Sequence, residues 1–129
     1  MVNHILMIEP WAGAASDVHW TLRRLGYEVH TAGADPHAIA TAYATRPDLI
    51  VAVVRAPGPS TLRVARTLSW VHQQPVVVLA DRATPDFARE VAEIPYVYDV
   101  IRYPPPIPWF LDAVEGAISA RDARCAALA

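Results

Sequence analysis

A few charged side chains of this 129-residue chain stand directly after runs of apolar residues, where they could share a site. Glu9 and Asp81 carry carboxylates, which together could bind a divalent ion weakly. Arg55 and Arg102 carry guanidinium groups, which suit a carboxylate or phosphate ligand. With Trp11 as an aromatic floor, these groups could line a ligand pocket. We favour the alternative, a solvated rim whose charges pair with one another, because strand alternation can turn Arg102 away from such a pocket.

Other residues with catalytic or metal-binding potential are dispersed along the chain. The five histidines share no metal-ligand spacing, so we predict no metal site. They are His4, His19, His30, His37 and His72. Cys125 is the single cysteine, so no disulfide can form within one chain. The sequence has no glycine-rich phosphate loop and no nucleophile paired with a base, so we predict neither a cofactor nor an enzyme activity.

The composition predicts a folded protein and excludes several functions. Apolar residues make up 53% of the chain, which is typical of a packed core, and the net charge of −2 disfavours a nucleic-acid-binding surface. All 11 basic residues are arginine, so chemistry that needs a lysine ammonium group is excluded. The sequence shows no signal peptide, and no stretch approaches the ~20 apolar residues of a membrane span. We therefore expect a cytoplasmic protein.

Short apolar runs alternate with amphipathic segments along the chain. The predicted strands are apolar or alternating runs, at residues 5–8, 27–31, 49–54, 75–80 and 96–101. The predicted helices have apolar residues at three- or four-residue spacing, at residues 16–25 and 35–46 and from residues 60, 84 and 107 onward. Asp35 and Thr84 each precede a proline, which is typical of a helix start. The periodicity places Leu25, Val71 and Ile107 on or near inner faces.

The polarity of the strands predicts their order in a sheet. Five alternating strand–helix units indicate a parallel sheet with helices on both faces. The first, third and fourth strands are apolar throughout, whereas the second and fifth contain Glu28, His30 and Asp99, so the polar strands belong at the edges. The order 2-1-3-4-5 satisfies this pattern and gives a doubly wound, flavodoxin-like α/β fold. We expect a single domain over residues 1–129, with its core at about 3–122 and a short alanine-rich tail.

The chain resembles the CheY-like response-regulator receiver family over nearly its whole length, and three segments carry the resemblance. PDLIVAVVRAPG at residues 47–58 resembles the third strand of that family and its Pro-Gly exit. PVVVLA at residues 75–80 resembles the fourth strand. DVIRYP at residues 99–104 resembles the fifth, which ends in a proline that commonly follows a cis peptide bond. The resemblance implies a site at the carboxyl ends of the strands.

The resemblance also implies a chemistry that this sequence has lost. In the family, a carboxylate after the third strand accepts a phosphoryl group, and two acids after the first strand hold Mg²⁺. A hydroxyl and a lysine steady the phosphoryl oxygens. Here the corresponding positions lack these groups, except that Glu9 retains one carboxylate of the acidic pair. They are Val53 for the acceptor, Glu9 and Pro10 for the acidic pair, Ala80 for the hydroxyl and Tyr103 for the lysine. We therefore expect a pseudo-receiver with a degenerate phosphorylation site.

The run PPPIPWF at residues 104–110 is the most distinctive local feature. Consecutive prolines stiffen the chain and remove backbone donors, so the run could present Trp109 and Phe110 to a protein partner. It could equally be a stiff connector that starts the last helix, with Phe110 at the margin of the core. The family implies a partner surface or dimer interface formed by the last strand and the two helices that flank it in sequence. Tyr96 and Tyr98 would add aromatic area there.

These observations leave two functional hypotheses from different classes. The first is a phosphorylation-independent pseudo-receiver that acts as a protein-interaction module in bacterial-type signal transduction, through itself or through a partner protein. Since no output domain follows in this sequence, the effect is expected to pass through the partner. The second is a small-ligand sensor that uses the vacated acidic pocket. An enzyme on the same scaffold is a weaker third reading, because fold alone does not imply function.

Overall fold

Five strands and five helices alternate along the chain in the computed structural model, which describes residues 3–55, 60–82 and 85–128. The strands are β1 (His4–Glu9), β2 (Glu28–Gly33), β3 (Leu49–Val54), β4 (Val76–Ala80) and β5 (Val97–Arg102). The helices are α1 (Ser16–Arg24), α2 (His37–Thr45), α3 (Ser60–His72), α4 (Pro85–Ala92) and α5 (Ile107–Leu128). Each predicted strand and helix is present.

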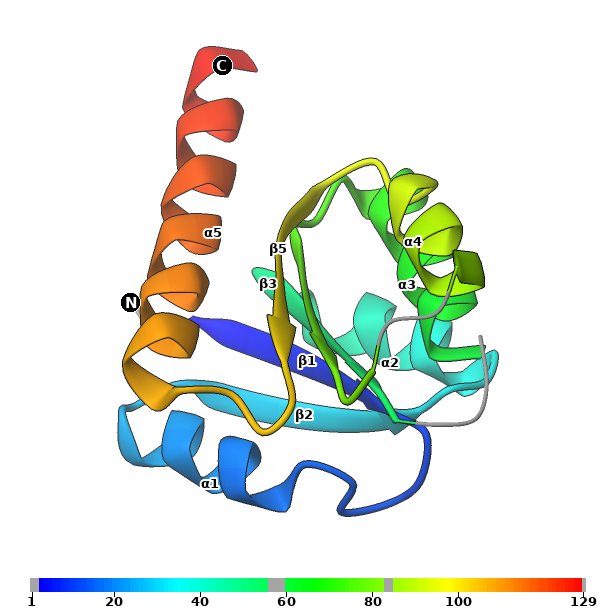
Figure 1. Ribbon diagram of the computed structural model, residues 1–129. Coiled ribbons are helices and arrows are strands. Elements are labelled where there is room, and N and C mark those ends of the chain that lie inside the picture. Colours follow the sequence, from blue (N-terminus) through cyan, green and yellow to red (C-terminus); the bar gives the residue numbers. More distant parts are fainter. Residues whose placement is uncertain (1–2, 56–59, 83–84, 129) are drawn as a thin grey trace.

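The strands form one parallel sheet in the order β2-β1-β3-β4-β5, which confirms the predicted flavodoxin-like arrangement. Figure 1 shows α1 and α5 on one side of the sheet and α2, α3 and α4 on the other. Because the strands are parallel, their carboxyl ends meet at one end of the sheet and their amino ends at the other. The fold therefore brings the loops after β1, β3, β4 and β5 together.

The two faces of the sheet carry separate hydrophobic clusters. Leu49, Val51 and Val53 point into the cluster beneath α1 and α5. Ile50 and Ala52, at the alternate positions of the same strand, point into the cluster beneath α2, α3 and α4. The continuous apolar runs of β1, β3 and β4 are needed because these strands are covered on both faces. The edge strands β2 and β5 keep exposed positions, as their polar residues predicted.

Some boundaries and inner-face predictions differ from the structure. Leu25 and Val71 are exposed at helix ends, beyond the contacts that bury the preceding turns. The Asp35 carboxylate accepts a hydrogen bond of 2.8 Å from the His37 backbone N–H, so it caps the start of α2 as predicted.

Helix α5 continues to Leu128, so the segment expected as a tail is helical and projects past the sheet in Figure 1. Thr84 and the Pro-Gly exit at residues 57–58 lie outside the described residues.

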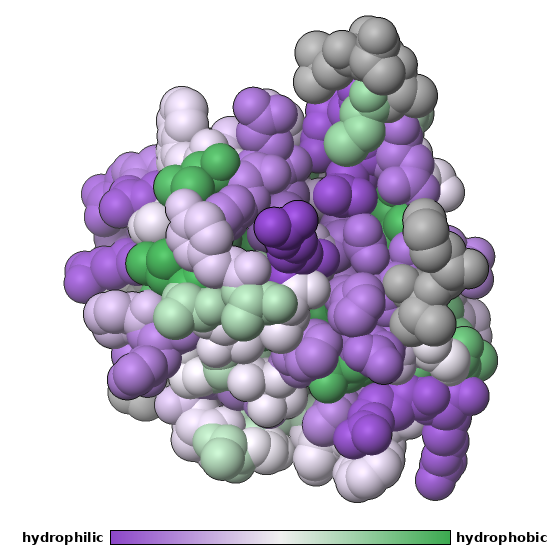
Figure 2. Space-filling model, turned by 180° about the vertical axis from the view of Figure 1, so that it is seen from behind, coloured by the Kyte–Doolittle hydropathy of each residue, from purple (hydrophilic) through white to green (hydrophobic). Residues whose placement is uncertain are grey.

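The surface seen from behind is mainly hydrophilic. Figure 2 shows apolar atoms on that side as separate patches within a polar surface. Within the ranges that the structure describes, no helix combines the length and the apolar character of a membrane span.

The first turn of α5 turns a different residue toward the core than the sequence pattern predicted. Phe110 is fully buried in the cluster beneath α1 and α5, whereas Trp109 is 71% exposed. Ile107, predicted to face inward, is 37% exposed. Phe110 therefore cannot be presented to a partner, so the interface interpretation is wrong for this residue, and the alternative that Phe110 packs against the core is confirmed. The aromatic ring instead fixes the amino-terminal turn of α5 against the sheet.

We predict that Phe110→Ala lowers the free energy of unfolding by about 3–5 kcal/mol, because it leaves a cavity in a closely packed core. Trp70→Ala is the control, because Trp70 is an exposed tryptophan of α3, and it should change stability by no more than about 0.5 kcal/mol. Urea denaturation followed by circular dichroism measures both changes. Equal losses for the two variants would contradict this placement of α5.

Candidate functional site

The loops at the carboxyl end of the sheet are joined by backbone hydrogen bonds. The Asp81 backbone N–H donates to the Val54 carbonyl at 3.2 Å, which links the exits of β4 and β3. The Tyr103 backbone N–H donates to the Ala80 carbonyl at 2.7 Å, which links the exits of β5 and β4. The peptide bond between Tyr103 and Pro104 is cis, as the resemblance implied. These contacts bring Arg55, Asp81 and Tyr103 together at the carboxyl end of the sheet.

Arg55 lies at the centre of this end of the sheet. Its guanidinium carbon is 4.7 Å from the centroid of the Tyr103 ring and 5.4 Å from that of the Trp11 ring. Its Nη1 donates a hydrogen bond of 3.1 Å to the Ala14 carbonyl, and its Nε is 3.9 Å from an Asp81 carboxylate oxygen. One half-buried cation thus contacts the loop after β1 and the exits of β4 and β5.

Glu9 ends β1 but does not lie on a solvated rim. The side chain is 5% exposed, and its Oε2 accepts a hydrogen bond of 3.0 Å from the Ala15 backbone N–H. Ala15 immediately precedes α1, so the carboxylate satisfies a backbone donor at a helix start, where negative charge is favoured. Glu9 is therefore used to position the loop between β1 and α1.

Tyr103 stands where the resemblance expects a lysine, and its phenol is tied to α1. The hydroxyl donates a hydrogen bond of 3.0 Å to the Asp17 carboxylate in the first turn of that helix. Burial raises the pKa of Tyr103 above its ordinary value, and the hydrogen bond and negative charge of Asp17 raise it further. The positive charge of Arg55 acts in the opposite direction and lowers this pKa. The phenol is therefore neutral at physiological pH and serves as a hydrogen-bond donor.

Apolar side chains occupy two other positions that the resemblance assigns to phosphoryl chemistry. Val53 is fully buried in β3 and belongs to the cluster beneath α1 and α5. Ala80, at the end of β4, is also buried. Neither side chain has an oxygen atom, so neither can accept or hydrogen-bond a phosphoryl group. Pro10 follows Glu9 and supplies no carboxylate.

The structure separates one predicted pocket residue from the others and adds one that was missed. Trp11, Arg55 and Asp81 converge as expected, whereas Arg102 is exposed and lines a groove between β5 and α5. Asp17 was not predicted, although its place in the first turn of the helix after β1 is a signal that could have indicated it. The site that results is an arginine cation flanked by two aromatic rings and the Asp81 carboxylate.

The groove beside β5 is the second notable feature of the surface. It has a volume of about 770 Å³ and is lined by residues of β5 and α5, including Tyr98, Arg102, Trp109 and Asp112. Tyr98 lies over Gly116 in α5, where a side chain would collide with the phenol ring. Tyr96 immediately precedes β5, and the Arg124 guanidinium carbon is 4.3 Å from its ring centroid.

The sequence matches no protein-family model and no curated protein. Solved structures with similar folds do exist. The signal receiver domain of a modulated diguanylate cyclase from Desulfovibrio desulfuricans superposes with a TM-score of 0.84 at 17% identity, over 96% of this chain and 99% of that one. The chemotaxis protein CheY4 of Vibrio cholerae gives 0.76 at 21% identity, over 91% and 99%. A CheY-like receiver domain protein of Methanospirillum hungatei gives 0.79 at 12% identity, over 96% and 99%.

These structures define the class of fold. The chain has the five-stranded flavodoxin-like fold of CheY-like response-regulator receiver domains, with the same near-complete coverage in each comparison. At these identities the similarity concerns the fold, so the function must be argued from the site.

We predict that Asp17→Asn lowers the pKa of Tyr103, because it removes the carboxylate charge that opposes ionisation of the phenol. Asp86→Asn, in exposed α4, should leave this pKa unchanged. The measurement is an alkaline titration followed by NMR of ring-labelled tyrosine, with the Tyr103 signal assigned from Tyr103→Phe. An unchanged pKa in Asp17→Asn would show that the hydrogen bond does not form in solution.

Proposed function

We propose that this protein is a pseudo-receiver, a regulatory module that acts through protein–protein contacts without being phosphorylated and without enzyme activity. The observation that carries the proposal is the position of Arg55. In the family that the sequence resembles, the carboxyl end of the sheet holds a divalent cation and an acceptor carboxylate. In this chain the same end holds an arginine cation against Asp81, and Val53 stands at the acceptor position.

The contacts of Arg55 favour a site that is permanently in one state. Switching by an added phosphoryl charge requires neighbouring segments that can rearrange around that charge. Here Arg55 already contacts the rings of Trp11 and Tyr103 and the Ala14 carbonyl. Tyr103 is in turn bonded to Asp17. The proposed mechanism is therefore constitutive presentation of a binding surface.

The small-ligand sensor receives less support from these contacts. A ligand in the vacated pocket would have to displace the Arg55 guanidinium from two aromatic rings and from Asp81. Glu9, the group expected to orient such a ligand, is buried and bonded to the Ala15 N–H. Arg102, the other expected orienting group, lies in the groove beside β5.

We propose the face formed by α4, β5 and α5 as the binding surface. β5 is the edge strand of the sheet, so one side of its backbone carries hydrogen-bonding groups that the sheet itself does not pair. Trp109 and Tyr98 are exposed beside it, and aromatic side chains of this kind commonly anchor interfaces. Arg102 and Asp112 give the groove both signs of charge, which suits contact with a second copy of the same surface.

The absence of phosphoryl transfer can be tested directly. Incubation with acetyl phosphate and Mg²⁺ should give no phosphoryl adduct in the intact mass, because no carboxylate stands at the acceptor position. An active receiver domain treated in parallel shows that the donor is competent. Stoichiometric labelling that disappears in Asp81→Asn would refute the proposal and identify Asp81 as a displaced acceptor.

The binding surface can be tested through self-association. We predict that Trp109→Ala weakens dimer formation at least about tenfold in sedimentation velocity, since truncating an anchoring tryptophan commonly costs 2 kcal/mol or more. Trp20→Ala is the matched control, because Trp20 is also exposed but lies on α1. A protein that stays monomeric at every concentration, or a dimer that only Trp20→Ala weakens, would contradict self-association through this face.

A further inference from the structure

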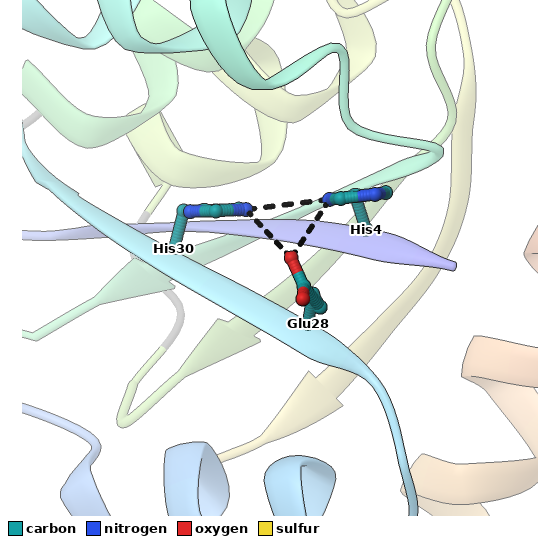
Figure 3. Close-up of side chains that lie close together, drawn as sticks. All are labelled: His4, Glu28 and His30. Carbon is teal, nitrogen blue, oxygen red and sulfur yellow. Dashed lines mark hydrogen bonds and ion pairs between the residues drawn. The ribbon is translucent and has the colours of Figure 1, made fainter. Parts of the chain in front are cut away.

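Two histidines and a glutamate converge at the amino ends of β1 and β2, far from the site described above. His4 comes from β1, and Glu28 and His30 come from β2 (Figure 3). The Nδ1 atom of His4 is 3.3 Å from Nε2 of His30, and the two rings are within 5° of parallel. Residue spacing does not indicate this cluster, because His4 and His30 are 26 residues apart in the chain.

The parallel register of the sheet places these side chains on one face. His4 pairs with Glu28, and Glu28 and His30 are alternate residues of the same strand, so all three point toward the α2 side. The His4 backbone is fixed by Asp48, whose carboxylate accepts from the His4 N–H at 2.8 Å and whose own N–H donates to the His4 carbonyl at 2.7 Å. The donors therefore project from backbone that the sheet holds in place.

The separations of the three donor atoms match those around a tetrahedral metal ion. The Glu28 Oε2 atom is 3.5 Å from His4 Nδ1 and 3.9 Å from His30 Nε2. Ligands of tetrahedral Zn²⁺ lie about 3.4 Å from one another, because each is about 2.0–2.1 Å from the ion. A point in the plane of the three atoms is about 2.1 Å from each of them. A tetrahedral ion lies out of that plane, so the donors must close on it by about a few tenths of an ångström when it binds.

We propose that His4, Glu28 and His30 form a Zn²⁺ site. Two imidazoles and one carboxylate are a ligand set that suits zinc, and the single negative charge of Glu28 partly balances the ion. In the metal-free protein, one of the two facing nitrogens carries the proton of their hydrogen bond. When zinc binds, that ring takes the other neutral tautomer, with its proton on the nitrogen remote from the ion.

The site would join the edge strand β2 to the central strand β1 at the end opposite Arg55. The His4 and His30 side chains are 35% and 32% exposed, so they keep limited freedom, whereas Glu28 is 58% exposed. The remaining coordination position therefore lies on the solvent side, where a water molecule or a ligand from a partner can complete the tetrahedron. Because zinc would bind the folded sheet only, it would also stabilise the fold.

The test is isothermal titration of the tag-free full chain with ZnCl₂, combined with thermal unfolding. We expect one Zn²⁺ per chain and a higher Tm with zinc. His30→Ala and Glu28→Gln should each weaken binding at least about tenfold, since even residues that only support a ligand cost 10–100-fold when removed. His37→Ala is the matched control, because His37 lies outside the cluster at the start of α2. Substitution with Co²⁺ should give the intense visible absorption of tetrahedral coordination.

Three results would overturn the proposal. One is the absence of stoichiometric zinc binding by the unaltered chain. Another is equal affinity in the unaltered chain, His30→Ala and Glu28→Gln. The third is a loss of binding in His37→Ala that matches the loss in His30→Ala. Because both test variants lie at the surface of an edge strand, their circular dichroism should remain native-like, so a loss of zinc binding can be assigned to the ligands.

Discussion

The positive charge of Arg55 is the constraint on which the carboxyl end of the sheet depends. A guanidinium group that is only partly solvated must find acceptors or aromatic faces, and it finds them in three separate parts of the chain. The loop after β1 supplies Trp11 and the Ala14 carbonyl, the exit of β4 supplies Asp81, and the exit of β5 supplies Tyr103. Removing the arginine would leave the aromatic rings and a carboxylate without their common partner. The loops are thus organised around a side chain of the protein itself.

The fold could be predicted from the sequence because its signals are local and repeated. The apolar run at residues 49–54 and the polar residues of β2 and β5 were sufficient to predict which strands are central, and the order of the sheet followed. The site was predicted only in part. Residues directly after strands could be assigned to the carboxyl end, but the direction of a long side chain such as Arg55 depends on packing. Phe110 was misplaced because the run of prolines hides the residue at which the helical phase of α5 begins.

The histidine cluster shows a different limit of sequence reasoning. Metal-ligand spacing is recognisable when ligands share one helix or loop, whereas His4 and His30 meet only through the pairing of two strands. The register of that pairing decides whether the rings face each other, and a shift of one residue would turn one of them to the opposite face of the sheet. Such a site becomes visible only when the pairing of β1 and β2 is known.

The closed arrangement around Arg55 has a consequence for how a cell could use the proposed module. A conventional switch stores information in the ratio of two conformations, and an upstream enzyme changes that ratio. When contacts within the chain hold one conformation, the ratio of conformations is fixed. The amount of complex then depends only on the affinity and on the concentrations of the partners. The quantity that then carries information is the number of copies present. Transcription, translation and proteolysis would set the strength of the signal, and its duration would be the lifetime of the protein.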